Sequence, residues 1–224
     1  MEAAASSPRR RVRRHGPAIA AACGAAALAA AAAVGFGLVS GEDGIEGWRL
    51  AARYTARLAF FLFLPVYLAS AWHQLAPSAA SRFVLERRRA LGLGFAVAHT
   101  VHLAALTTFL VAAESAPDLA TILVGGAAYA GLFAMAATSN DASVRLLRRR
   151  WRTLHRTGLH LLWFVFAFTY VTRMERDAAF FAPLAALALG ALGVRLVAAA
   201  RRRQRRQSSA AGAAARTARS SASR

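Results

Sequence analysis

Residues 148–170 read RRRWRTLHRTGLHLLWFVFAFTY, and this stretch shows the organisation of the chain on a small scale. A block of arginines leads directly into an almost unbroken apolar run, with His155 at its start and His160 just inside it. An arginine block beside a long apolar run is typical of a segment that enters a lipid bilayer from the cytoplasmic side. The histidines need a separate explanation, because ionisable side chains are costly within a membrane.

The same pattern recurs along the chain. The 224 residues are 57% hydrophobic and carry a formal net charge of +19. A helix needs about 20 apolar residues to cross a hydrocarbon core of about 30 Å. Six stretches have about that length: 17–40, 50–72, 90–113, 119–138, 154–172 and 178–200. Period-two alternation is absent, and a membrane admits only helices or closed barrels. The sequence therefore predicts an all-α bundle of six transmembrane helices, or five if the alanine-rich first stretch is a cleaved signal.

The segments that connect these stretches alternate in charge. One set is basic (RRRVRR, RFVLERRR, RLLRRRWR and RRRQRR), and the other is acidic or mixed (GEDGIEG, AESAPD and TRMERDA). The positive-inside rule places the basic set in the cytoplasm, which predicts a multi-pass protein of the inner or plasma membrane with both termini inside. Each basic tract adjoins an apolar stretch, so contact with the lipid bilayer explains it and nucleic-acid binding is not predicted.

The two ends of the chain are predicted to lie outside the bundle, which occupies residues 17–203. Residues 1–16 form a basic cytoplasmic tail. Residues 204–224 lack large apolar side chains, so they are predicted to form a disordered basic cytoplasmic tail. Cys23 is the only cysteine, which excludes an intramolecular disulfide and an all-cysteine metal cluster.

Two histidines lie deep within the third apolar stretch. His99 and His102 are far from both ends of residues 90–113, and their spacing of three places them on neighbouring parts of one helix face. A neutral imidazole at this depth is a suitable ligand for a metal ion or a haem iron. The alternative is that each histidine forms a hydrogen bond with a serine, threonine or carbonyl of a neighbouring helix.

Two short motifs give the chain a family resemblance. The first is RRxLGL at residues 88–93 with His102 nine residues beyond it, and the second is WxxLHR at residues 151–156. Together they resemble the ferric reductase-like transmembrane domain family, in particular its MsrQ-like haem-binding membrane subunits, over residues 49–172. The resemblance implies a six-helix bundle that holds one or two b-type haems between its third and fifth helices and passes electrons across the membrane.

The resemblance also implies partners and ligands. No flavin or nicotinamide domain is expected in the chain, and such family members receive electrons from a separate reductase or quinol and pass them to a separate acceptor. His102 matches the ligand of the haem nearer the outer face, and His155 matches the ligand of the haem nearer the cytoplasm. The family's second ligand on the fifth helix falls at Phe168, and its inner ligand on the third helix falls at Arg88, neither of which can bind iron.

Several ligand arrangements therefore stay open. His102 lies about 20 Å beyond Arg89 at 1.5 Å per residue, so His102 and His155 are not partners. His73 has about the depth of His155 and could complete an inner site. His99 and His160 could meet if the fifth helix enters the membrane early. Otherwise His102 holds a five-coordinate haem, or the chain is a haemless six-helix protein with a structural role or a carrier role for small solutes or ions.

An arginine stripe enters the second apolar stretch from its outer end. Arg49, Arg53 and Arg57 recur every four residues and share one helix face. Arg57 is the deepest of them, and if it faces the bundle it needs an anion, for which haem propionates at the depth of His102 are suitable. The alternative is that Arg57 extends towards the outer headgroups.

The predicted topology can be tested with reporter fusions. We expect fusions after Arg150 and after Arg206 to report cytoplasm, and a fusion after Glu114 to report the outside, because the basic loops share one side. A compartment-sensitive reporter measures this directly. An external signal from the Arg150 fusion would refute the topology.

Overall fold

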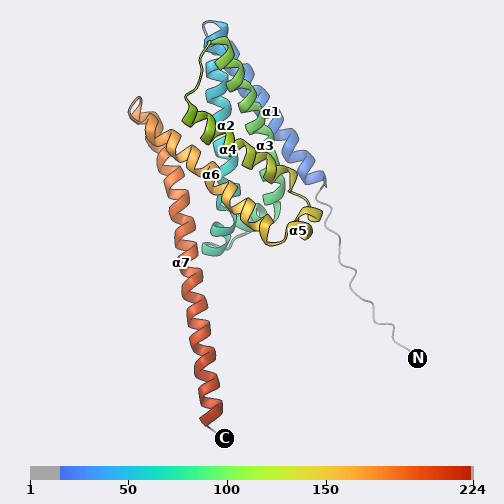
Figure 1. Ribbon diagram of the computed structural model, residues 1–224, viewed down its shortest axis with the longest axis vertical. Coiled ribbons are helices and arrows are strands. Elements are labelled where there is room, and N and C mark those ends of the chain that lie inside the picture. Colours follow the sequence, from blue (N-terminus) through green and yellow to red (C-terminus); the bar gives the residue numbers. More distant parts are fainter. Residues whose placement is uncertain (1–15, 223–224) are drawn as a thin grey trace, which may run out of the picture.

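The computed structural model describes residues 16–222, and the side chains of residues 16–211. The predicted N-terminal tail, apart from Gly16, lies outside the described residues. Within them every regular element is a helix, which confirms the all-α prediction (Figure 1). The helices are α1 Gly16–Ser40, α2 Gly44–Leu75, α3 Ala79–Ala112, α4 Leu119–Ala137, α5 Asp141–Leu147, α6 Arg149–Arg173 and α7 Ala178–Ala222.

Helices α1, α2 and α3 pack against one another along their length. Small residues fill their contacts, in two clusters of buried alanines: Ala26, Ala30 and Ala98, and Ala51, Ala52 and Ala105. A Cβ atom added at Gly37 of α1 would lie 2.3 Å from the backbone nitrogen of Ala51 in α2. Small side chains let membrane helices approach closely and gain dispersion contacts, which replace the hydrophobic effect as the source of association in lipid.

Helices α4, α6 and α7 form the second part of the bundle. In Figure 1, α4 and α6 run obliquely past the long helices, and α7 descends beside them. α6 packs against α4 and α7, and α7 also packs against α2. The largest core cluster joins these helices to α2 and α3 through a group of aromatic side chains that includes Phe60, Phe63, Phe95, Phe166 and Tyr170. This aromatic core contacts His99, one of the two candidate histidines of α3, through Phe95 and Phe166.

Side-chain caps mark the starts of four helices. Asp43, Ser78, Asp118 and Asn140 each accept a hydrogen bond from a backbone N–H three residues later, at α2, α3, α4 and α5. Such caps satisfy backbone donors that have no partner within the helix. Hydrogen bonds from the Thr121 hydroxyl and N–H hold the pKa of the Asp118 carboxyl below its usual value.

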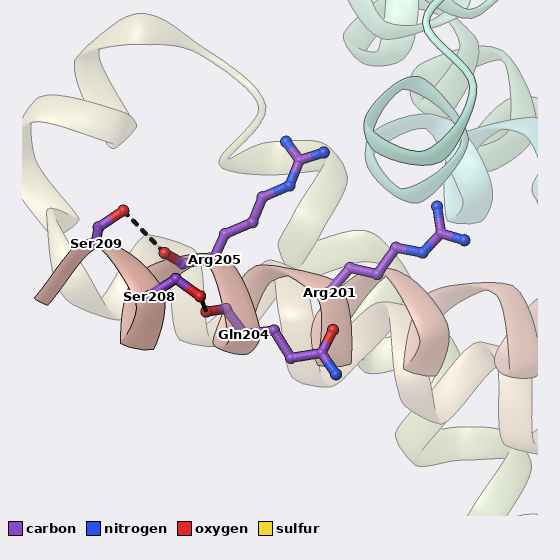
Figure 2. Close-up of a pocket in the computed structure, with 5 residues that line it drawn as sticks. All are labelled: Arg201, Gln204, Arg205, Ser208 and Ser209. Atoms are coloured by element: carbon purple, nitrogen blue, oxygen red, sulfur yellow. Dashed lines mark hydrogen bonds between the residues drawn. The ribbon is translucent and has the colours of Figure 1, made fainter. Parts of the chain in front are cut away.

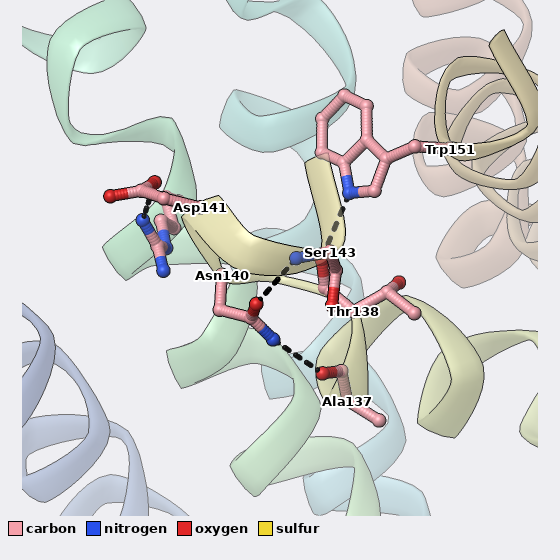
Figure 3. A network of polar contacts seen from close by, with 7 residues as sticks. Ala137, Thr138, Asn140, Asp141, Ser143 and Trp151 are labelled. Carbon is pink, nitrogen blue, oxygen red and sulfur yellow. Dashed lines mark hydrogen bonds and ion pairs between the residues drawn. The ribbon is translucent and has the colours of Figure 1, made fainter. Parts of the chain in front are cut away.

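A corner between α4 and α6 sets the position of the WxxLHR motif (Figure 3). Arg148, with φ 47°, separates the short α5 from α6. The Trp151 indole Nε1 donates to the Thr138 carbonyl at 2.9 Å, which ties the first turn of α6 to the end of α4. Asp141 accepts an ion-pair contact from Arg89 of α3 at 2.8 Å. The corner is therefore linked by polar contacts to both α4 and α3.

Among the residues that the structure describes, five helices are long and apolar enough to cross a membrane: α1, α2, α3, α4 and residues 178–211 of α7. The chain is therefore a multi-pass helical membrane protein. α6, predicted as the fifth of six spans, is not among these helices, since His155, Arg156 and His160 lower its apolar content. Its contacts with α4 and α7 shelter part of its surface, so α6 needs less apolar character than a helix surrounded by lipid. Six spans and cytoplasmic termini stay predictions.

The C-terminal region differs from the sequence prediction. The sequence predicts a disordered tail at residues 204–224, but α7 continues as a helix to Ala222. Alanine, arginine and glutamine dominate this region and are strong helix formers. A helix already started by the preceding apolar segment extends at low cost, since nucleation is the unfavourable step.

The close approach of α1 and α2 predicts a specific sensitivity at Gly37. We expect Gly37→Ala to lower the stability of the protein in detergent by about 1–3 kcal/mol, since backbone atoms of Ala51 occupy the space of the new methyl group. Thermal unfolding followed by circular dichroism measures the change. Gly35→Ala is the matched control, because nothing lies within 4 Å of its Cβ position. Equal stability of the two variants would contradict the described packing.

Candidate functional site

The His99 and His102 side chains lie together in the interior of the bundle. Their ring centroids are 5.2 Å apart, as expected for neighbours on one helix face. His99 is 8% exposed and stacks on Tyr129 of α4 at 4.9 Å, with Phe166 of α6 at 5.6 Å. Among the described residues, the His99 Nδ1 atom is buried and has no hydrogen-bond partner. A polar atom left unpaired in an apolar interior is costly, so His99 is the histidine whose environment is least satisfied.

His102 is held by a hydroxyl group of α2. The Thr55 hydroxyl donates to the Ala51 carbonyl at 2.7 Å, and its oxygen lies 3.2 Å from His102 Nδ1. Since the hydroxyl proton is used by the carbonyl, Nδ1–H of His102 is the donor in this contact and Nε2 keeps its lone pair. A fixed ring with a free Nε2 lone pair is the form of histidine that binds a metal ion.

His155 lies at the corner between α4 and α6. Its Nε2 is 3.1 Å from the Thr138 hydroxyl, and its ring stacks on Trp151 at a centroid distance of 4.1 Å. The Thr138 hydroxyl donates to the Ala134 carbonyl at 2.7 Å, so His155 Nε2–H donates to the Thr138 oxygen. The Nε2 nitrogen of His155 is therefore used in holding α6 against α4.

His73, considered as a partner for His155, contacts a different group. Its Nδ1 is 3.0 Å from the hydroxyl of Ser81, a fully buried residue in the first turn of α3. The Ser81 hydroxyl also contacts the carbonyls of Ala76 and Ser78. His73 therefore takes part in the turn between α2 and α3, and the structure does not bring it into contact with His155.

His160 contacts α2 and α7 instead of His99. Its Nδ1 is 3.1 Å from the hydroxyl of the fully buried Tyr67, and its Nε2 is 3.5 Å from Arg195. Neither Tyr67 nor Arg195 was predicted as a partner of His160 from the sequence. The signal for Arg195 was present, since it is the one charged residue in the apolar run 184–200. Tyr67 gave no such signal, because a tyrosine in an apolar helix usually has a packing role.

Arg57 points towards α7 rather than to a carboxylate. Its guanidinium lies 4.2 Å from the ring centroid of Phe180 and 5.5 Å from that of Tyr54. Arg173, at the end of α6, lies within electrostatic range of Arg57. The hydroxyl of Tyr170, also close to Arg57, is buried without a hydrogen-bond partner in the described part of the chain.

The other members of the arginine stripe face outwards. Arg49 forms an ion pair with Glu46 in the same turn of α2, and Arg53 is exposed. Arg57, which is partly buried, and Arg173, which is exposed at the end of α6, thus place two positive charges near Tyr170, on the α6 side of the aromatic core. An anion placed here would meet two guanidinium groups and an unpaired hydroxyl.

The contacts of the described histidines give no support to a haem held by histidines from two helices, whereas a ligand held from α3 alone is compatible with them. His102 presents a free Nε2 lone pair, and His99 has an unpartnered nitrogen. Phe168, at the family's second ligand position, is 58% exposed and stacks on Phe164 at the outer surface of α6. No group of three or more histidine, cysteine, aspartate or glutamate side chains in the described part of the chain could hold a bare metal ion.

Comparisons with known proteins identify no relative: no family model, no curated protein and no solved structure matches the chain. The resemblance to ferric reductase-like transmembrane domains therefore stays a hypothesis that rests on the two sequence motifs. A function for this chain therefore has to be inferred from the geometry of the site.

The contact between Thr55 and His102 predicts a stability effect. We expect Thr55→Val to destabilise the protein by about 1–3 kcal/mol, because the His102 ring loses its hydroxyl partner on α2. Thermal unfolding in detergent measures this. The matched control is Thr107→Val in α3, where an exposed threonine bonds only its own helix carbonyl. A Thr55 variant as stable as the control would show that the contact contributes nothing.

Proposed function

We propose that the chain is an integral membrane redox protein that holds a b-type haem in the half of the bundle away from its basic loops, with His102 as the iron ligand. A haem bound there would supply reversible one-electron transfer at its iron. The proposal is supported most directly by the buried pair of imidazoles on α3, one oriented by Thr55 and the other unsatisfied at Nδ1. It follows the family resemblance for the role of His102 and departs from it in needing no ligand on α6.

The surrounding residues have distinct roles in this proposal. Thr55 fixes the ring of His102 so that Nε2 stays unprotonated and available to iron. The aromatic core of Phe60, Phe63, Phe95 and Phe166 excludes water, which lowers the local dielectric constant and influences the reduction potential. Arg57 and Arg173 would supply positive charge for the propionate groups of a haem bound here. Electrons would come from a separate reductase or quinol and pass to a separate acceptor.

A second candidate function is a haemless membrane protein with a structural role or a carrier role for small solutes or ions. One observation favours it: four histidines have a hydroxyl partner from another part of the bundle, in the pairs His73–Ser81, His102–Thr55, His155–Thr138 and His160–Tyr67. Such contacts can hold helices together without a cofactor. This second function leaves two observations unexplained: the unpaired Nδ1 of His99, and the positive charges of Arg57 and Arg173.

Absorption spectroscopy of the protein purified in mild detergent after expression with ample haem tests the proposal. We expect a Soret band and, in pyridine, the reduced spectrum of a b-type haem, because no CxxCH motif is present for covalent attachment. His102→Ala should remove most of the bound haem. His73→Ala is the control, since His73 bonds only within the turn between α2 and α3.

Further variants of the same protein separate the neighbouring groups. Arg57→Leu should weaken haem retention or lower the reduction potential, whereas Arg49→Leu should have little effect because Arg49 already pairs with Glu46. Loss of haem in His99→Ala with no loss in His102→Ala would move the ligand one turn along α3. A colourless wild-type protein would refute the proposal and favour the haemless function.

A further inference from the structure

Two arginines from different helices lie against neighbouring carbonyls of α2. Arg195 of α7 donates from Nη1 to the Tyr67 carbonyl at 2.6 Å, and its guanidinium lies 4.3 Å from the centroid of the Tyr67 ring. Arg88 of α3 donates from Nε to the Val66 carbonyl at 3.2 Å and from Nη1 to the Ser70 hydroxyl at 3.3 Å. Because Val66 and Tyr67 are adjacent, both cations are fixed in one region of the bundle.

Within residues 16–211, neither of these two arginines forms an ion pair with a carboxylate. The ion pairs found between described residues lie elsewhere, at Glu46–Arg49 and Arg89–Asp141. Arg88 and Arg195 are close enough to repel each other, and Arg202 adds a third positive charge beside Arg195. Like charges in a partly buried setting are costly, so an anion bound between them would stabilise the folded protein.

Hydrogen bonding in the same region leaves donors without acceptors. Since a guanidinium can only donate, His160 Nε2 accepts from Arg195, and His160 Nδ1–H must then donate to the Tyr67 oxygen. This leaves the Tyr67 hydroxyl proton and an Nη2 group of Arg88 without an acceptor among the described residues. A site with surplus donors and surplus positive charge is complementary to an oxyanion.

The site lies close to the basic ends of two membrane helices. Arg195 is six residues before the basic block at 201–203, which corresponds to about 9 Å along α7. Arg88 belongs to the basic block at 87–89 on the same side of the bundle. Arg195 is flanked in the chain by large apolar side chains that are exposed and can contact acyl chains: Val194, Leu196 and Val197.

The surface of α7 beyond this site is also suited to a headgroup. Arg201 and Arg205 project from the same side of the helix, next to Gln204, Ser208 and Ser209 (Figure 2). These five residues form an open polar surface along one side of α7. Their side chains offer two more guanidinium groups and hydrogen-bonding groups for the polar part of a ligand.

We propose that Arg88, Arg195, Tyr67 and His160 form a binding site for a phosphate oxyanion, and that this phosphate belongs to an anionic glycerophospholipid of the leaflet that faces the basic loops. Free phosphate shares the same oxyanion chemistry. The lipid is favoured because the site is partly buried among membrane helices and is bordered by exposed apolar side chains. This site is separate from His99 and His102, so the proposal does not depend on haem binding.

Native mass spectrometry of the full-length protein in detergent tests the site, with dioleoylphosphatidylglycerol, dioleoylphosphatidylcholine and inorganic phosphate as separate probes. We expect the protein to retain phosphatidylglycerol in preference to phosphatidylcholine. Arg195→Gln and Arg88→Gln should each weaken phosphatidylglycerol binding about tenfold, because each removes a charge-assisted hydrogen bond to the phosphate in addition to a surface charge. Arg152→Gln is the matched control, because Arg152 is an exposed arginine at the same boundary.

Each alternative result has a definite meaning. If either glutamine variant keeps the helical content of the wild type and binds phosphatidylglycerol as tightly, the site is refuted. If inorganic phosphate binds at these arginines and the protein shows no preference for phosphatidylglycerol over phosphatidylcholine, the lipid assignment is refuted. The second glutamine variant provides the test if the first one does not fold.

Discussion

The hydrogen bond between a hydroxyl group of one helix and an imidazole of another is the interaction on which this bundle depends. Thr55 with His102 joins α2 to α3, Thr138 with His155 joins α4 to α6, and Tyr67 with His160 joins α2 to α6. In lipid no water is available to satisfy a polar side chain, so each of these contacts fixes both the rotamer and the relative position of two helices. Arg195 extends the last contact to α7.

This constraint also explains why His99 is the exceptional residue. Its ring is enclosed by Phe95, Tyr129 and Phe166, which offer apolar faces but no acceptor or donor for Nδ1. A cost of this kind is expected at a functional position rather than in a helix contact. The proposed haem ligand, His102, is its neighbour on the same helix face. The ring that Thr55 orients and the ring with an unpaired nitrogen therefore lie side by side in the bundle.

Sequence patterns predicted the helical class and most of the spans, because hydropathy reports directly on the cost of placing a segment in lipid. The spacing of His99 and His102 likewise predicted their contact, since both lie on one helix. Helix lengths were less accurate: α2 and α3 extend beyond the predicted apolar stretches, since polar first and last turns remain helical when capped. The C-terminal helix was missed because lack of apolar residues was taken to indicate disorder, although its alanines and arginines favour a helix.

Contacts between side chains of different helices could not be predicted from the sequence. No spacing rule pairs Thr55 with His102 or Tyr67 with Arg195, because 47 and 128 positions separate them in the chain. The same limit applies to Phe168, whose outward direction depends on how α6 is rotated against α4 and α7. The two sequence motifs therefore pointed to histidines one at a time, and the structure was needed to show which of them have partners and which arginines lack one.

Electron paramagnetic resonance of the oxidised, haem-loaded protein tests most directly the central claim that one histidine of α3 holds the iron. A haem with His102 as its single protein ligand should give a high-spin ferric signal, which His102→Ala should abolish. A low-spin signal characteristic of two histidine ligands would contradict the claim, because the described histidines of the other helices, His73, His155 and His160, contact other groups. The absence of any haem signal in the wild-type protein would contradict it as well.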